Sequence, residues 1–283
     1  MRKDLFCTCI ENYCCFGVEI LKKKTMLWNF LIFQIKKNNL YNVTQETNLG
    51  CISLISMLKL EKSDSVKVGN MEKIILNKNS KVLFIGDSIT DVKFNSKKRF
   101  SFKGNKIYAL QLKKKFKEYS KAVNVEIKGI ASNRTYHVYD RLTKDCINLK
   151  PDVIIMLIGV NDAWENYGPE NYPPLLRPME PHMKEIYRRI NAELPGTQVL
   201  YLMPFLIDAV EEKLPFHKML DEFREVLKSL ALENGAKVLD LQEVFNEAQK
   251  TIEPVKLAVD GIHPTNLGHK VIADAIEKVI EFR

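Results

Sequence analysis

The sequence predicts an α/β fold in which a parallel β-sheet is covered by helices on both faces. From residue 81 onward, short apolar segments alternate with longer segments that have the spacing of amphipathic helices. Strands that alternate with helices favour parallel pairing, because each helix carries the chain back to the same edge of the sheet. Hydrophobic residues make up 46% of the 283 residues, which is enough apolar material for a sizeable core.

The first half of this region contains three of the predicted strands. Residues 82–85 are entirely apolar and end at Gly86, and residues 153–158 form an apolar run of six within the strand predicted over 152–158. Such runs are typical of strands that are buried on both faces of a parallel sheet. Between these two strands, the pattern predicts a helix over residues 105–119, a strand over 123–127 and a helix over 135–149.

The second half continues the alternation, with stop signals at the ends of elements. Pro195-Gly196 and Asn234-Gly235 each follow a helical segment, and Pro204 closes a strand. The predicted elements are a helix over residues 181–194, a strand over 199–203, a helix over 215–234, a strand over 238–241 and a closing helix over 266–282.

Residues 1–70 differ in character from the rest of the chain. We interpret them as a poorly ordered or non-native extension that precedes a single domain over residues 71–283. The apolar stretch over residues 26–35 is too short to cross a bilayer, and no small-residue cleavage site follows it. Five of the six cysteines precede residue 52, which favours reduced thiols over a disulfide framework. We therefore expect a cytoplasmic protein without a membrane span, although the unusual N-terminal region leaves secretion open.

The formal net charge of +8 raises the question of an anionic partner. The densest basic run outside the extension is Lys113-Lys114-Lys115 with Lys117, and it alternates with apolar residues as on the solvent face of an amphipathic helix. No aromatic residues are interleaved with basic ones as in a nucleic-acid-binding stripe. We expect no nucleic-acid partner, and the motifs described next require neither a metal nor a cofactor.

Four short segments contain the residues that could carry chemistry: Gly86–Thr90, Gly129–Asn133, Gly159–Asp162 and Asp260–Pro264. Ser88 lies just beyond the first strand and Asn161 just beyond the third, and ligands bind at that edge of parallel sheets. Asp260 and His263 are three residues apart, so the carboxylate can hold one ring nitrogen while the other faces a hydroxyl. Taken singly, each segment also fits a turn or a helix cap.

In combination and in this order, the four segments resemble those of the SGNH, or GDSL-like, esterases and acylhydrolases. The resemblance covers about residues 80–275. It implies a flavodoxin-like three-layer α/β/α sandwich with a five-stranded parallel sheet. It also implies that Ser88 is the nucleophile, His263 the base and Asp260 its orienting partner. The implied oxyanion hole consists of the backbone N–H groups of Ser88 and Ser132 and the side-chain amide of Asn161.

The second segment departs from the family pattern, because Ser132 stands where a glycine is usual. Serine keeps the backbone N–H donor, but it is strained if the backbone there needs a positive φ. Three further residues are candidates for substrate binding. Asp87 adjoins the nucleophile, and Arg134 fits either a substrate anion or a neighbouring carboxylate. Trp164 fits either a sugar or acyl pocket or the protein core.

The sequence thus predicts a serine esterase that hydrolyses short acyl groups, such as acetyl, on a carbohydrate or a similar small molecule. A lysophospholipase or thioesterase of the same family is the alternative within this class. A non-catalytic flavodoxin-like module that binds a sugar or acyl ligand is the alternative from another class, and Ser132 is its best support. The sequence leaves the oligomeric state undetermined.

Overall fold

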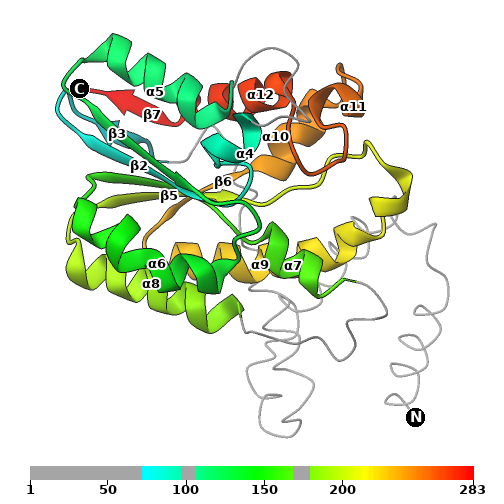
Figure 1. Cartoon of the computed structure of the whole chain (residues 1–283), viewed down its shortest axis with the longest axis horizontal. Helices are drawn as coiled ribbons and strands as arrows, with labels where there is room; N and C mark the ends of the chain where they lie inside the picture. Colours follow the sequence, from blue (N-terminus) through cyan, green and yellow to red (C-terminus); the bar gives the residue numbers. More distant parts are fainter. Residues whose placement is uncertain (1–71, 97–105, 168–178) are drawn as a thin grey trace, which may run out of the picture. The chain divides into compact units, whose positions relative to one another are not determined.

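A five-stranded parallel sheet lies at the centre of the computed structural model, with strand order β3-β2-β4-β5-β6 (Figure 1). Every pair of neighbouring strands is parallel, and β2 pairs with both β3 and β4. The strands are β2 (Lys81–Gly86), β3 (Asn124–Gly129), β4 (Val153–Leu157), β5 (Gln198–Met203) and β6 (Lys237–Asp240). This confirms the predicted fold class.

The structure describes residues 72–96, 106–167 and 179–283. They belong to one compact unit, Val66–Arg283. The extension predicted over residues 1–70 lies outside the described residues. Within the described ranges, no helix has both the length and the apolar character that a bilayer crossing requires.

Helices cover both faces of the sheet, and the alternation of side chains along each strand explains why. In β2, Val82 and Phe84 belong to one buried cluster, whereas Leu83 and Ile85 belong to the other. Successive strand residues point to opposite faces, so a strand that is apolar throughout supplies two cores. The first cluster contains side chains from helices α5 (Tyr108–Tyr119), α10 (Leu241–Ala248) and α12 (Asn266–Lys278) on one face (Figure 1). The second contains side chains from α6 (Thr135–Asp145), α8 (Met179–Glu193) and α9 (Phe216–Glu233) on the other face.

The five predicted helices are present in the structure with small differences at their ends, whereas the four shorter helices of the described residues were not predicted. The helix predicted over residues 135–149 ends at Asp145 and is followed by a 3₁₀ turn, Ile147–Leu149. The main helices are α5 (Tyr108–Tyr119), α6 (Thr135–Asp145), α8 (Met179–Glu193), α9 (Phe216–Glu233) and α12 (Asn266–Lys278). The shorter ones are α4 (Val92–Ser96), α7 (Val160–Glu165), α10 (Leu241–Ala248) and α11 (Pro254–Leu257).

The C-terminal segment was predicted wrongly in one respect. The closing helix ends at Lys278 rather than at Phe282, and β7 (Ile280–Phe282) follows it. This strand pairs in parallel with β1 (Ile74–Leu76), which the sequence pattern did not reveal either. The two strands form a separate small sheet. The pairing joins segments about 200 residues apart, so local periodicity carries no signal of it.

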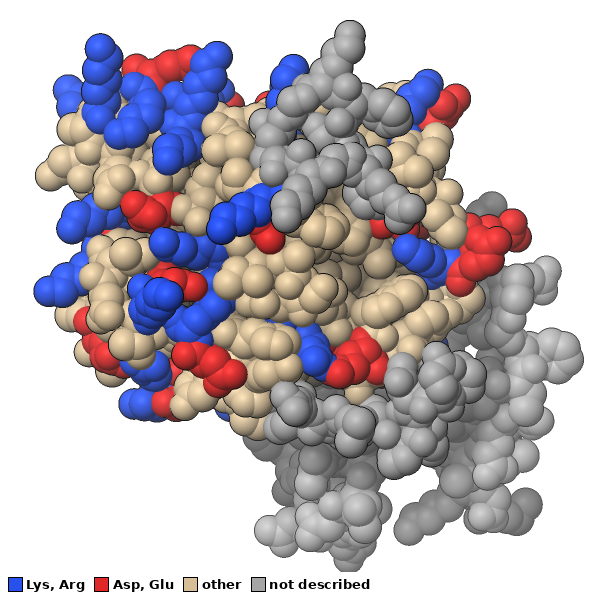
Figure 2. All heavy atoms as spheres, viewed as in Figure 1, with Lys and Arg blue, Asp and Glu red and all other residues tan. Residues whose placement is uncertain are grey.

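A cluster of basic residues lies on the solvent face of one helix, α5. In Figure 2, Lys and Arg side chains cluster over α5, whose solvent face carries Lys113, Lys114, Lys115 and Lys117. The opposite side of this helix buries Leu112 and Phe116 in the core. Its lysines therefore form the wet side of an amphipathic helix, as the sequence predicts.

Candidate active site

Three side chains from distant parts of the sequence form one hydrogen-bonded chain at the carboxyl edge of the sheet. Ser88 Oγ lies 3.0 Å from His263 Nε2, although 175 residues separate them. On the other side of the ring, His263 Nδ1 lies 2.7 Å from Asp260 Oδ2. Ser88 follows β2, and the other two residues lie in the loop before α12. The structure therefore brings Ser88, His263 and Asp260 together in the order hydroxyl, imidazole, carboxylate.

Asp260 remains a carboxylate because hydrogen bonds outweigh the cost of its partial burial. Its other oxygen, Oδ1, accepts the backbone N–H groups of Ile262 at 3.0 Å and His263 at 2.8 Å. Burial by itself raises the pKa of Asp260, but the His263 ring and these two N–H groups lower it to about 2. An ionised Asp260 accepts a hydrogen from Nδ1 and leaves Nε2 unprotonated toward the serine.

Ser88 is presented by a sharp turn at the end of β2. A side chain at Gly86 would place its Cβ only 2.2 Å from the carbonyl oxygen of Leu157, so only glycine fits there. Asp87 Oδ1 then accepts the backbone N–H of Ile89 at 2.9 Å, across the serine. This bond closes the turn around the hydroxyl-bearing residue.

The side chain of Asp87, a predicted substrate-binding residue, has no exposed surface in this structure. Burial raises the pKa of Asp87 to about 7, against the opposing effect of the Ile89 N–H. Its second oxygen, Oδ2, has no hydrogen-bond partner among the described residues. The carboxyl group thus shapes the turn from within the protein.

The two other predicted oxyanion donors, Ser132 and Asn161, follow β3 and β4, the strands on either side of β2. Asn161 follows β4 at the start of α7, and its Nδ2 donates one hydrogen to the carbonyl oxygen of Asn133 at 2.9 Å. An amide has two such hydrogens, so this bond orients the group and leaves the other for a substrate oxygen. Ser132, the residue before Asn133, has an exposed side chain.

Ser132 adopts a left-handed backbone conformation with φ of 62°. Among the described residues other than glycine, only Lys150 also has a positive φ. Serine at this position is therefore strained, which is one of the two possibilities that the sequence left open. A non-glycine residue in this region costs on the order of 1 kcal/mol relative to glycine.

Replacing Ser132 by glycine should therefore raise the free energy of unfolding by about 0.5–1 kcal/mol, because glycine adopts positive φ without strain. The backbone N–H is retained, so any catalysis that uses this donor should be kept. Urea unfolding at pH 7 measures the first effect. Lys150→Gly is the matched control for strain remote from the site. A Ser132→Gly protein that is less stable than wild type would contradict the strain argument.

The structure bears on the two alternatives that the sequence left open for Arg134 and for Trp164. The guanidinium of Arg134 forms an ion pair with Glu165 and donates to the hydroxyl of Tyr136 at 3.1 Å. Its charge is therefore satisfied by the protein, which favours the neighbouring-carboxylate interpretation. Trp164 is 39% exposed and packs edge-on against Phe216. It is a surface aromatic residue with a buried support.

Lys213 connects Trp164 to the loop that carries the acid and the base. Its Nζ lies 5.3 Å from the centre of the Trp164 ring and donates to the carbonyl oxygen of Asp260 at 2.7 Å. A cation over an indole face is attracted to it. This contact could not be predicted, because Lys213 and Asp260 are 47 residues apart and share no motif.

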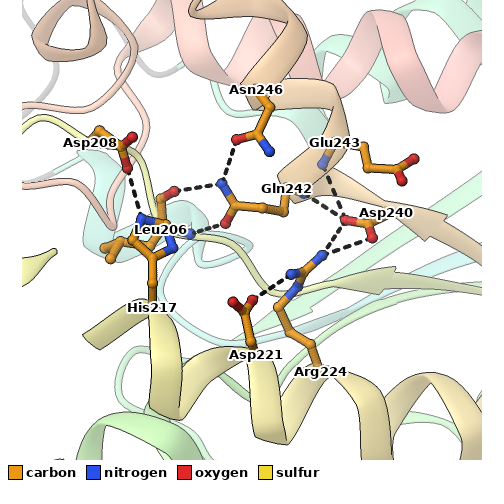
Figure 3. Close-up of polar contacts among 9 residues, drawn as sticks. All are labelled: Leu206, Asp208, His217, Asp221, Arg224, Asp240, Gln242, Glu243 and Asn246. Atoms are coloured by element: carbon orange, nitrogen blue, oxygen red, sulfur yellow. Dashed lines mark hydrogen bonds and ion pairs between the residues drawn. The ribbon is translucent and has the colours of Figure 1, made fainter. Parts of the chain in front are cut away.

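A buried glutamine, Gln242, holds the segment that follows β5 (Figure 3). The amide of Gln242 forms two hydrogen bonds with the backbone of Leu206, each 2.9 Å long. The next residue, Ile207, donates its N–H to the carbonyl oxygen of Gly261 at 2.8 Å. The segment after β5 is thereby fixed to α10 on one side and to the acid–base loop on the other.

The described residues offer no evident metal site. No group of three His, Cys, Asp or Glu side chains within them is close enough to hold one ion. The arrangement instead contains the parts that nucleophilic catalysis at a carbonyl requires: a hydroxyl next to a base, a carboxylate that orients the base, and neighbouring N–H donors.

Comparison with known proteins places this arrangement among ester hydrolases. The model of the GDSL-like lipase/acylhydrolase family matches residues 84–271, which is well over half of the chain. An acetylxylan esterase from Geobacillus stearothermophilus is 29% identical over 226 residues, which cover 77% of this chain and 97% of that protein.

Solved structures agree with this result. A catalytic mutant of an acetylxylan esterase from Geobacillus stearothermophilus aligns with a TM-score of 0.61 and 26% identity, covering 74% of this chain and 97% of that one. A structure from Parabacteroides merdae, described as that of a GDSL-like lipase, aligns with a TM-score of 0.62 and 27% identity over 73% of this chain and 98% of that one. Both identities exceed 25%, so the likeness extends beyond the fold.

Proposed function

Because the chain belongs to the GDSL-like lipase/acylhydrolase family, and is thus a hydrolase of ester bonds, we propose that it removes acetyl groups from an acetylated carbohydrate. The observation that carries the mechanism is the continuous hydrogen-bonded chain from Ser88 through His263 to Asp260. The likeness to acetylxylan esterases supports the substrate class.

In the first half of the reaction, Ser88 Oγ attacks the ester carbonyl while His263 Nε2 accepts its proton. The imidazolium then donates this proton to the leaving sugar oxygen as the carbon–oxygen bond breaks, so the sugar departs as a free hydroxyl and an acetyl-serine remains. Asp260 stabilises the imidazolium and keeps its tautomer without taking the proton.

In the second half, water replaces the sugar. His263 accepts a proton from the water as its oxygen attacks the acetyl carbonyl, and this proton passes to Ser88 Oγ as acetic acid leaves. In both halves the negative oxygen is held by the N–H groups of Ser88 and Ser132 and by the Asn161 amide. Donors placed beforehand at the position where charge develops account for the largest share of such catalysis.

Trp164 is the residue best placed to receive the sugar. Lys213 links its exposed ring to the acid–base loop, because the Lys213 ammonium lies over the ring and donates to the carbonyl oxygen of Asp260. A flat indole packs well against the C–H face of a pyranose ring, because one side of such a ring is apolar. We assign Arg134 to the wall of the site, since its charge is already paired with Glu165.

A panel of esters tests this assignment of substrate. We expect kcat/KM for p-nitrophenyl acetate to exceed that for p-nitrophenyl octanoate by about tenfold or more, because a pocket shaped for a methyl group cannot take six further carbons without strain. Acetylated xylo-oligosaccharides should be hydrolysed, with acetate release as the measurement. Ser88→Ala provides the blank for every substrate.

Other outcomes of the panel select the alternatives. Faster hydrolysis of octanoyl esters and of lysophospholipid than of acetyl esters would establish a lipid hydrolase instead. A folded wild-type protein that binds acetylated sugars but turns over no ester would establish a binding module.

A further inference from the structure

One arginine joins the turn of the nucleophile to the loop of the second oxyanion donor. Arg141 lies in α6, and its Nη2 donates to the carbonyl oxygen of Gly86 at 3.0 Å. Its Nε donates to Asn133 Oδ1 at 2.9 Å, and its Nη1 donates to the carbonyl oxygen of Lys128 at 3.0 Å. Nη1 also pairs with Asp145, one helical turn further on, at 2.9 Å.

Through these contacts, Arg141 is connected to the backbone near each proposed oxyanion donor. Gly86 is two residues before Ser88, and Asn133 directly follows Ser132. The carbonyl oxygen of the same Asn133 accepts the side-chain amide of Asn161. A single rigid group therefore fixes the backbone on both sides of the place where the oxyanion forms.

We propose that Arg141 is a positioning residue of the esterase, which sets the spacing of the oxyanion donors relative to Ser88. The inference rests on the proposed function. Arg141 touches no reacting atom and acts through Gly86 and Asn133. Catalysis depends steeply on such spacing, because donors must lie within hydrogen-bond distance of the oxygen as it becomes charged.

The geometry requires arginine rather than any cation. A guanidinium is planar and presents five N–H donors in fixed directions, so it can hold these four acceptors at the same time. A lysine ammonium at the end of a flexible stem cannot reproduce that pattern. Asp145 balances the charge of the Arg141 side chain, which is only 12% exposed.

The test compares Arg141→Lys and Arg141→Met with a matched control, Arg224→Met. The Arg224 side chain is 11% exposed, and its guanidinium is likewise paired, with Asp221 and Asp240 (Figure 3). It contacts neither the nucleophile turn nor the oxyanion loop in any bond described above. Both arginine sites should lose stability on truncation, which urea unfolding measures, whereas only the Arg141 site should lose catalysis.

For Arg141→Met and Arg141→Lys we expect kcat on p-nitrophenyl acetate to fall about 10- to 100-fold with KM nearly unchanged, since misplacing oxyanion donors weakens the transition state more than the ground state. The lysine variant keeps the pairing charge for Asp145 and serves if the methionine variant fails to fold. In a third variant, Arg141→Ala, millimolar guanidinium should restore part of the lost kcat, and an equal concentration of urea should not.

Two results would overturn the inference while leaving the proposed function intact. The first is an active wild-type enzyme whose Arg141→Lys variant keeps kcat within about twofold. The second is an equal loss of kcat in Arg224→Met and Arg141→Met at equal fractions folded. A wild-type protein that hydrolyses no ester would instead overturn the proposed function itself.

Discussion

Ser88→Ala should lower kcat for p-nitrophenyl acetate by about 10⁴- to 10⁶-fold, because the variant can form no acyl-enzyme and retains only binding and the remaining oxyanion donors. The hydroxyl lies 3.0 Å from His263 Nε2, and it is the group that the proposed reaction acylates. Its loss removes one partly buried hydrogen bond, so the free energy of unfolding should change by only about 1 kcal/mol. Steady-state kinetics and urea unfolding measure the two effects.

Ser80→Ala is the matched control for this change. Ser80 precedes the same strand, β2, at its other end, and its exposed fraction is 3% against 5% for Ser88. Its hydroxyl accepts the N–H of Asn77 at 2.9 Å, so the control also removes one hydrogen bond. Comparable turnover by Ser88→Ala and Ser80→Ala would eliminate Ser88 as nucleophile.

Asp260→Asn should lower kcat by about 10³- to 10⁴-fold, because it replaces the carboxylate that orients the histidine of a Ser–His–Asp triad with an amide. An amide can donate to Nδ1, and this favours the tautomer that carries its hydrogen on Nε2. That tautomer cannot accept the proton of Ser88. The KM should change little, because Asp260 contacts His263 rather than the substrate.

The chain offers a second aspartate–histidine pair as the control. Asp208 Oδ1 lies 2.7 Å from His217 Nε2, the same separation as between Asp260 and His263. Asp208→Asn therefore disrupts an aspartate–histidine pair of equal separation that has no hydrogen bond to Ser88 among those given for the described residues. An Asp208→Asn protein as impaired as Asp260→Asn would show that the loss is not specific to the proposed triad.

Because the pKa of Asp260 is lowered in the folded protein, the effect of Asp260→Asn on the free energy of unfolding should depend on pH. The folded-state pKa of about 2 lies below the ordinary value of 3.8. The carboxylate therefore adds stability that is fully present above about pH 4 and is lost as the pH falls toward 2. We expect the stability difference between wild type and Asp260→Asn to be largest near neutral pH and to shrink over that acidic range.

Much of the fold could be predicted because its signals are local. The apolar runs of β2 and β4 and the terminators at Pro195-Gly196 and Asn234-Gly235 each lie within a few residues of the element they define. Helix α10 was missed, since Leu241 was read as the end of a strand. A signal was present nonetheless: Asp240 caps the helix by accepting the N–H groups of Gln242 and Glu243. The small sheet of β1 and β7 carries no such local signal.

The residues of the candidate site likewise divide into those that the sequence predicts and those that only the structure reveals. Ser88, Asp260 and His263 could be proposed because each lies in a short recognisable segment, and the structure places them together. Arg141 and Lys213 could not, because each acts on backbone carbonyls of residues 55 and 47 positions away. Any residue type supplies a carbonyl oxygen, so such contacts leave no pattern in the sequence.

The backbone at Ser132 and the burial of Asp87 also depend on tertiary structure. The sequence shows that serine replaces a glycine, but only the fold reveals the positive φ that makes this replacement costly. Asp87 adjoins the nucleophile in sequence, yet the turn directs its side chain inward. Proximity along the chain is therefore a poor guide to which side chains a substrate can touch.

Covalent labelling with a fluorophosphonate, followed by peptide mass spectrometry, tests the central claim most directly. A hydroxyl activated by His263 should form one adduct, on the peptide that contains Ser88, and hydrolysis should cease in proportion to labelling. His263→Ala should label far more slowly under the same conditions. Continued ester hydrolysis with Ser88 unmodified, or a stoichiometric adduct on another residue, would contradict the assignment of this serine as the nucleophile.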